Sequence, residues 1–408
     1  MSVAFISPFF GPDAAGGAEA ECRQTALHLA RTGIDVEVLT TCGLDLQHDW
    51  NFSYHPAGVS NDEGLTVRRF PIENGDLSLF PELNSRLARG ETLSPSEESQ
   101  FMALHINSFP LYRYLAAEHH RYDSLFFIPY LFGTTVHGTR IAPGKSRLIP
   151  CLHDEGYARM AMVKELFTRV AGIIFHTQAE RELARRLYGP LGGRDHLIGE
   201  GIDTELLSDG NRFRRKYGID GPFILYAGRK DREKGVDRLI GNFEAYKKAR
   251  PGPLRLVLVG QGAIPVPVTM QAQILDLGFV PRQDKNDAYS AAAVFCQPSL
   301  NESFSIVMME AWLCGTPNLV HADCAVTREH VVRAGGGLYF RGPAEFRACL
   351  DYLLSETDMA SRMAAAGRRY VLDHFAWNRV VASYRDLLAR GSADLGSPPG
   401  ERRAPPHR

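Results

Sequence analysis

The sequence lacks an excess of charge of either sign, because 46 Lys and Arg residues nearly balance 47 Asp and Glu residues. A nucleic-acid-binding protein needs a dominant basic face, so we expect no nucleic-acid partner. The seven cysteines are scattered and form no Cys-x-x-Cys pair. Disulfide frameworks and zinc sites depend on such spacings, and scattered thiols are typical of a reducing cytoplasm.

Long apolar runs are also missing from the chain. No stretch approaches the roughly 20 residues of a transmembrane helix, and the N-terminus has no charged region like that of a signal peptide. We therefore expect a cytoplasmic protein, and peripheral contact with the inner face of a membrane stays open. Arginines in the C-terminal tail could touch anionic lipid, although a solvated tail is the expected state.

Signals for a metal or an organic cofactor are absent as well. The chain contains no Asp-x-Asp and no cluster with metal-ligand spacing. Gly260-Gln-Gly262 follows an apolar run, but the third glycine of a dinucleotide fingerprint is missing. We expect no bound metal and no cofactor.

What the chain does have is an alternation of short apolar runs with helical patterns, which predicts parallel sheets built from βαβ units. A chain of 408 residues exceeds one ordinary core. We predict an α/β fold with two doubly wound Rossmann-like domains, residues 1–200 and 201–374, facing each other across a cleft. A helix over 375–390 is expected to pack back on the first domain, and residues 391–408 are expected to form a disordered tail.

Two glutamates stand out after an apolar run in the second half, because Glu302 and Glu310 have seven residues between them. An apolar stripe predicts a helix over 305–313 that places Glu302 in the preceding loop and Glu310 in the second turn. The first N–H groups of this helix would seat a phosphate. The amides that would assist belong to Ser303, Phe304 and Ser305. An ordinary helix with a glutamate at its favourable dipole end is the alternative.

Two cations, Arg229 and Lys234, follow the strand predicted over 223–227 and the adjoining Gly228. Cations that flank a turn could neutralise a diphosphate and stabilise the charge that grows on it as a bond breaks. The loop contains other charged residues, so a plain solvated loop is the alternative.

Four further residues lie where predicted strands end. Gly17 precedes a helix and would let the backbone approach a ligand because it has no Cβ, although a tight turn would use it equally. His153 follows the strand predicted over 147–152, and it could also be an ordinary surface or core histidine. Phe279 and Val280 follow another predicted strand, where they could equally form a core edge.

These segments together resemble the retaining GT-B glycosyltransferases with a Glu-x7-Glu motif, which build lipopolysaccharide, capsule and exopolysaccharide chains. The resemblance covers nearly the whole chain and rests on four segments in the family's order: Met1–Phe10 with Gly16-Gly17-Ala-Glu19, Phe223–Val236, Ser299–Pro317 and Phe375–Val380. It departs at Ser305, where the family often has glycine. A side chain there narrows the space beside the donor sugar.

The resemblance implies metal-independent transfer of a hexose, with a slight preference for mannose, from a nucleotide diphosphate sugar to a hydroxyl of a surface polysaccharide or lipid-linked glycan. Glu302 would contact the transferred sugar, Glu310 the ribose, and Arg229 with Lys234 the diphosphate. The imidazole of His153 would lie near the donor sugar.

The backbone of the segment containing Phe279 and Val280 would recognise the base, with a side chain packing on its ring. Two alternatives stay open: a nucleotide-sugar epimerase of the same architecture, and a non-catalytic nucleotide-sugar-binding subunit. The base, the linkage, the acceptor and the oligomeric state are not indicated by the sequence.

Overall fold

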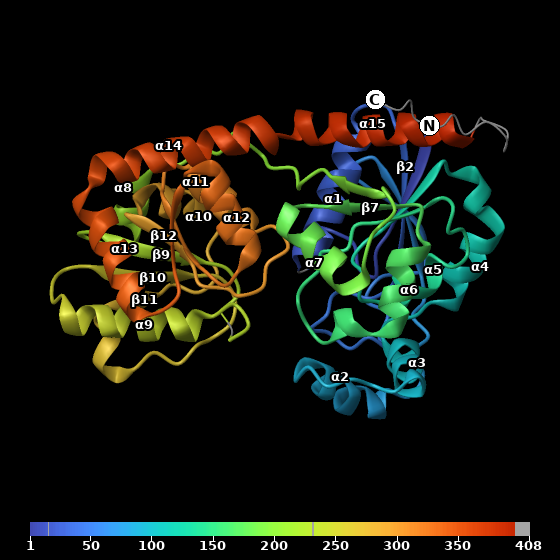
Figure 1. Cartoon of the computed structure of the whole chain (residues 1–408), viewed down its shortest axis with the longest axis horizontal. Helices are drawn as coiled ribbons and strands as arrows, with labels where there is room; N and C mark the ends of the chain where they lie inside the picture. The colour runs from blue at the N-terminus through green and yellow to red at the C-terminus, as the bar shows by residue number, and fades with distance from the viewer. Residues whose placement is uncertain (15, 231, 396–408) are drawn as a thin grey trace, which may run out of the picture. The chain divides into compact units, whose positions relative to one another are not determined.

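The computed structural model describes residues 1–14, 16–230 and 232–395, and in it the chain forms two compact units (Figure 1). Of the described residues, unit 1 contains those in 1–175, 183–201 and 378–395. Unit 2 contains residues 176–182 and 202–377.

Unit 1 is built on an eight-stranded sheet in the order β3-β4-β2-β1-β5-β6-β7-β8. Neighbouring strands are parallel, except for the antiparallel hairpin of β3 and β4 at one edge. Its strands are β1 (Ser2–Ile6), β2 (Asp35–Thr41), β3 (Gly58–Asp62), β4 (Leu65–Phe70), β5 (Ser124–Phe127), β6 (Ser146–Leu148), β7 (Gly172–Phe175) and β8 (Asp195–Leu197). Its helices are α1 (Gly17–Ala30), α2 (Phe80–Ala88), α3 (Pro95–Leu104), α4 (Phe109–Glu118), α5 (Gly133–Gly138) and α6 (Ala161–Arg169), followed by most of α7 (Gln178–Tyr188) and α15 (Trp377–Leu395).

Unit 2 is built on a six-stranded parallel sheet in the order β11-β10-β9-β12-β13-β14. Its strands are β9 (Phe223–Ala227), β10 (Arg255–Val259), β11 (Ile274–Asp276), β12 (Val294–Gln297), β13 (Asn318–His321) and β14 (Gly337–Phe340). Its helices are α8 (Gly210–Tyr217), α9 (Val236–Ala249), α10 (Arg282–Ala291), α11 (Ile306–Leu313), α12 (Ala325–Ala334), α13 (Pro343–Ser355) and α14 (Thr357–His374). Short 3₁₀ turns occur at Leu77–Leu79, His119–Arg121, Tyr157–Arg159 and Val268–Met270.

Both faces of the unit 2 sheet are covered by apolar side chains, as the continuous apolar strands predict. Along β9, Phe223 and Leu225 join one buried cluster, whereas Ile224 and Tyr226 join another on the opposite face. The predicted fold class, two Rossmann-like α/β domains with parallel sheets, is confirmed.

The C-terminal helix is longer than predicted. Within unit 1, Tyr384 of α15 is buried and meets the ring of Phe126 on β5 with centroids 5.8 Å apart. The helix continues to Leu395, so the prediction of disorder from residue 391 is wrong for 391–395. Gly391 costs a helix only about 1 kcal/mol relative to alanine, which does not end a long helix. The remainder of the predicted tail, 396–408, lies outside the described residues.

Within the described ranges, no helix has both the length and the apolar character that crossing a membrane would require. The seven cysteines form no disulfide.

Candidate functional site

The strand order of unit 2 reverses between β9 and β12, because the chain adds β10 and β11 on one side of β9 before it crosses to β12 on the other. Open α/β sheets bind ligands at such a reversal, beyond the carboxyl ends of the two strands. The predicted residues of this unit follow β9, β11 or β12 at that end. The topology therefore gathers them at one edge of one sheet.

The loops after β9 and β12 pass in direct contact. Gly235 begins α9 with a φ of 72°, and a Cβ on it would lie 2.6 Å from the carbonyl oxygen of Pro298. Only glycine satisfies both this conformation and this approach. The close contact sets the two loops side by side, so that side chains from each can meet.

Lys234 and Glu302 form an ion pair across these two loops, with Lys234 Nζ 2.8 Å from Glu302 Oε1. The amide of Gln297, the last residue of β12, donates to the same oxygen at 2.8 Å. The Glu302 side chain is only 10% exposed and that of Lys234 28%. Burial at this level makes the pairing important, because an unpartnered carboxylate would be costly here.

Glu310 lies in the second turn of α11, as predicted, and has two partners on α10. Lys285 Nζ is 2.8 Å from its Oε1, and the hydroxyl of Tyr289 donates to its Oε2 at 2.9 Å. Burial and the nearby Glu310 carboxylate raise the pKa of Tyr289 well above its ordinary value. The phenol therefore keeps its proton and acts as a permanent donor.

Arg229 is the more exposed of the two predicted cations. Its side chain is 47% exposed, and its guanidinium lies 3.4 Å from Glu233. The neighbouring Lys230 is buried and pairs with Asp276, so it serves the structure of the loop. The hydroxyl of Tyr226 donates to the backbone carbonyl of Arg229 at 2.6 Å, which fixes the loop just beyond Gly228.

The loop before α11 is anchored by Phe304, which is 1% exposed. Its ring meets those of His330, Phe375 and His176 edge-on, with centroids 5.0, 4.9 and 6.1 Å away. Only the backbone of Phe304 is therefore left for a ligand. The adjacent Ser303 is half-buried, and Ser305 begins α11 with a φ of 79° and no side-chain cap.

Phe279 and Val280 follow β11 and differ sharply in exposure. The Phe279 residue is 73% exposed, whereas Val280 is buried in the core beneath the site. An exposed ring at the carboxyl edge of the sheet can stack on a flat ligand. Val280 instead anchors the segment by packing into a buried apolar cluster of unit 2.

In unit 1, the start of α1 is more constrained at Gly16 than at Gly17. A Cβ on Gly16 would lie 1.9 Å from a carboxylate oxygen of Glu19, whereas a Cβ on Gly17 would meet nothing within 4 Å. Glu19 is buried, and burial together with the charge of Asp45 raises its pKa to about 7.

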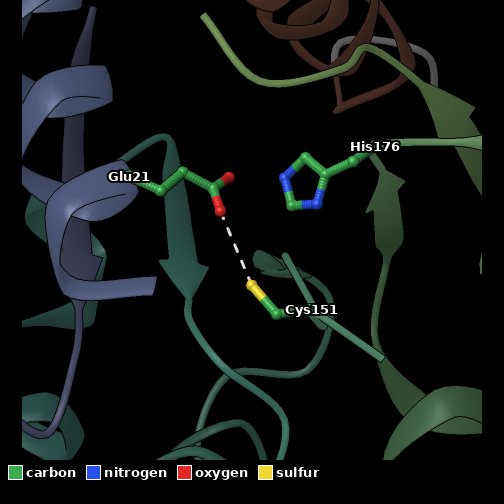
Figure 2. Close-up of side chains that lie close together, drawn as sticks. All are labelled: Glu21, Cys151 and His176. Carbon is green, nitrogen blue, oxygen red and sulfur yellow. Dashed lines mark hydrogen bonds between the residues drawn. The ribbon is translucent and has the colours of Figure 1, made fainter. Parts of the chain in front are cut away.

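His153 follows β6, which ends at Leu148 and not at the predicted residue 152. Between them, Cys151 has a φ of 52° and its Sγ donates to Glu21 Oε2 at 3.5 Å. Figure 2 shows this bond between α1 and the segment after β6. Asp154, the next residue, forms ion pairs with Arg159 and Arg186.

Sequence reasoning missed three residues of the unit 2 site: Lys285, Tyr289 and Gln297. A partial signal existed for the first two, because residues four apart share one face of a helix. That this face points to α11 depends on packing that the sequence pattern does not encode.

Two families of known proteins match the chain, one in each half. The family described as "Glycosyl transferase 4-like domain" matches residues 16–196, and that described as "Glycosyl transferases group 1" matches residues 209–370. The D-inositol 3-phosphate glycosyltransferase of Xylanimonas cellulosilytica is 28% identical, over 94% of this chain and 93% of its own.

Two further comparisons bear on function and fold. The GDP-mannose-dependent alpha-(1-6)-phosphatidylinositol monomannoside mannosyltransferase of Mycolicibacterium smegmatis is 25% identical, over 58% of this chain and 68% of its own. Among solved structures, sucrose-phosphate synthase from Thermosynechococcus elongatus superimposes with a TM-score of 0.73 at 18% identity, covering 96% of this chain and 99% of that one.

Proposed function

The chain belongs to the glycosyltransferases of the GT-B fold, enzymes that use a nucleotide sugar, and we propose that it transfers a hexose with retention of the anomeric configuration. Mannose from GDP-mannose is the expected donor, and a hydroxyl of a surface polysaccharide or lipid-linked glycan is the expected acceptor. One observation carries the proposal. Two glutamates whose side chains are each 10% exposed, and each paired with a lysine, flank the start of α11 at the strand reversal of unit 2.

Each part of the donor has a matching group in this arrangement. The carboxylate of Glu310 can accept hydrogen bonds from the two ribose hydroxyls, and that of Glu302 from hydroxyls of the hexose. The diphosphate lies between them in this arrangement, at the first N–H groups of α11 and the ammonium of Lys234. Phe279 offers its exposed ring to the base.

The chemistry follows from where charge develops. When the bond between the hexose and the diphosphate breaks, negative charge grows on the leaving phosphate, where Lys234, Arg229 and the α11 amides stabilise it. The acceptor hydroxyl attacks the same face of the oxocarbenium-like hexose, and the leaving phosphate oxygen takes its proton. His153 of unit 1 is the residue that we expect beside the donor hexose. Because these cations and amides stabilise the negative charge on the leaving phosphate, we expect turnover without a divalent metal.

The preference for mannose has two supports. The mycobacterial relative is named for GDP-mannose, and this chain carries Glu302-Ser-Phe-Ser305 at the hexose-binding loop. The acceptor has a second candidate, inositol 3-phosphate, because the Xylanimonas cellulosilytica relative, which matches over 94% of this chain, is named for it.

The test is a transfer assay with purified protein. GDP-mannose, UDP-glucose and UDP-N-acetylglucosamine are each supplied with a mannan oligosaccharide, a lipid-linked oligosaccharide or inositol 3-phosphate, with and without EDTA. The expected result is an α-mannoside identified by NMR, formed equally with EDTA present. A β-linked product would refute retention, and loss of turnover in EDTA would refute metal independence. Conversion of the donor sugar without any acceptor would identify an epimerase instead.

A further inference from the structure

Gln297 has one amide atom whose bonding is complete and one whose bonding is not. Its Nε2 donates to Glu302 Oε1 at 2.8 Å. Its Oε1 is buried and meets no hydrogen-bond donor among the described residues, and the residue as a whole is 3% exposed. Buried carbonyl oxygens without a partner are rare in folded proteins and call for an explanation.

Rotating the amide does not remove the problem. The two ends of a glutamine side chain are assigned from their hydrogen bonds. A rotated amide would place its oxygen against the Glu302 carboxylate, where two acceptors repel each other, and the bond to Glu302 would be lost. The unsatisfied atom next to Glu302 is therefore an acceptor, and it needs a group that carries a hydrogen.

Ser305, in the loop that contains Glu302, has two further unfavourable features besides the unsatisfied oxygen of Gln297. Its φ of 79° lies in the left-handed region, which is uncommon for residues other than glycine. Its hydroxyl oxygen is buried without a hydrogen-bond partner among the described residues, and it does not cap α11. A glycine at this position would remove both costs. Strained residues of this kind gather at functional sites.

We propose that Gln297, with Ser305, selects the transferred sugar by binding one of its hydroxyls beside Glu302. This inference rests on the proposed donor site. Gln297 Oε1 accepts the hydroxyl hydrogen, and the Ser305 side chain closes the space that glycine would leave open. A phosphate oxygen cannot take this place opposite Gln297, because it has no hydrogen to give. The amide thus recognises the sugar, whereas the diphosphate binds elsewhere on the loop.

Donor binding also explains how the covered atoms become accessible. Lys234 Nζ is paired with Glu302, and it is also the group that the proposed mechanism assigns to the diphosphate. When it moves to the phosphate, Glu302 gains free lone pairs for the sugar. The hydroxyl that replaces Lys234 then lies within reach of the Gln297 amide, which is already bonded to that carboxylate.

The experiment is a cycle that removes the hydroxyl from one side and the amide from the other. Dissociation constants are measured by calorimetry for GDP, GDP-mannose and its monodeoxy analogues lacking the 2-, 3-, 4- or 6-hydroxyl, with the native protein and Gln297→Leu. In the native protein, one analogue should bind about tenfold or more weakly than GDP-mannose, since the site then keeps an unpaired acceptor. In Gln297→Leu the penalty for that same analogue should shrink to less than about threefold, and GDP should bind as before.

Matched variants separate recognition from structural support. Gln273→Leu is the control, because Gln273 also has a buried Oε1 without a partner but lies before β11, away from Glu302. It should leave every constant unchanged. Ser305→Gly should raise the melting temperature of the unliganded protein and weaken discrimination among the analogues. It serves as a second test of the inference if Gln297→Leu does not fold.

Two outcomes would overturn the inference. Equal penalties in the native protein and Gln297→Leu for every analogue would show that the amide senses no hydroxyl. A Ser305→Gly protein that is more stable and discriminates as before would show that the serine is only a source of strain. If the native protein shows the predicted coupling in binding but transfers no sugar, the inference stands and the proposed transferase reaction fails.

Discussion

Replacing Glu310 by glutamine tests the nucleotide half of the site with little change of shape. The Glu310 carboxylate is bonded to Lys285 and Tyr289, and its side chain is 10% exposed. The variant keeps one carbonyl oxygen, which can still accept from Tyr289. The other oxygen becomes an NH₂ group, which cannot accept a hydrogen bond from a ribose hydroxyl. It also cannot accept one from the Lys285 ammonium, because both groups are hydrogen-bond donors.

The size of the effect follows from the bonds that change. A hydrogen bond to a charged group contributes about 1.5–3 kcal/mol. Glu310→Gln removes one such bond to the ribose and converts the other to a neutral one, so we expect a total loss of about 2–3 kcal/mol. That loss corresponds to a dissociation constant for the nucleoside diphosphate roughly 30- to 150-fold higher. Lys285 is 29% exposed and stays solvated, so folding should suffer less than binding.

Calorimetry with GDP and 2′-deoxy-GDP separates this effect from a general disturbance. The native protein should prefer GDP by about tenfold or more, because the deoxy compound leaves a carboxylate lone pair without a donor. Glu310→Gln should bind both nucleotides weakly and nearly equally. A variant that binds GDP within about threefold of the native protein, or that keeps the full preference for GDP, would refute the assignment of Glu310 to the ribose.

Two further predictions address the base and the response to pH. Phe279→Ala should weaken nucleoside diphosphate binding about tenfold, because stacking on a base contributes about 1–3 kcal/mol, while the melting temperature stays unchanged since the residue is 73% exposed. Unchanged binding in the calorimeter would remove Phe279 from the site. Burial among aromatic rings lowers the pKa of His105 from 6.5 to about 3. Between these two pH values the unfolded chain binds a proton at His105 that the native protein does not bind. The free energy of unfolding should therefore fall as the pH drops from 6.5 toward 3, by about 2–3 kcal/mol at pH 4.5. Urea unfolding of His105→Phe should show a smaller fall over this pH range than urea unfolding of the native protein. An equal pH dependence in the two proteins would refute the assignment of this effect to His105.

The strands that the sequence predicts well are those buried on both faces. Apolar runs predict strands over 223–227 and 294–297, and β9 and β12 have these bounds. Their continuous apolar runs bounded by polar turns leave little freedom in where the strand begins or ends. Helix α13 over 343–355 is similarly well defined, since Pro343 favours the first turn.

Edge strands and broken helices are less visible in the sequence. β3 is largely exposed and lacks an apolar pattern, whereas the short β14 starts at the last of three glycines whose pattern predicts a turn. An amphipathic pattern around 101–118 predicts a single helix, but the structure has two helices there, α3 and α4. The chain turns between them at Ile106, which has a φ of 54°, and Pro110 allows α4 to start anew.

The candidate site shows the same division between local pattern and packing. The pairing of Lys234 with Glu302 joins residues that are 68 positions apart in the chain, yet both belong to segments with a clear pattern. The roles of Lys285, Tyr289 and Gln297 depend on which face of α10 packs on α11 and on how β12 ends. Such information lies in tertiary contacts, for which a single sequence gives no signal.

The partners of the two glutamates also explain how nearly buried carboxylates can be kept ready to accept ligand hydroxyls. Two carboxylates whose side chains are each only 10% exposed would be costly without partners, and Glu302 and Glu310 each have a lysine and a neutral donor. On binding, the neutral donors Gln297 and Tyr289 can stay, while the lysine contacts are exchanged for hydroxyl and phosphate groups. Donor binding is then an exchange of partners at fixed carboxylates. Because the number of buried charges without partners does not rise, the affinity is set by how well the sugar and ribose hydroxyls replace the lysines.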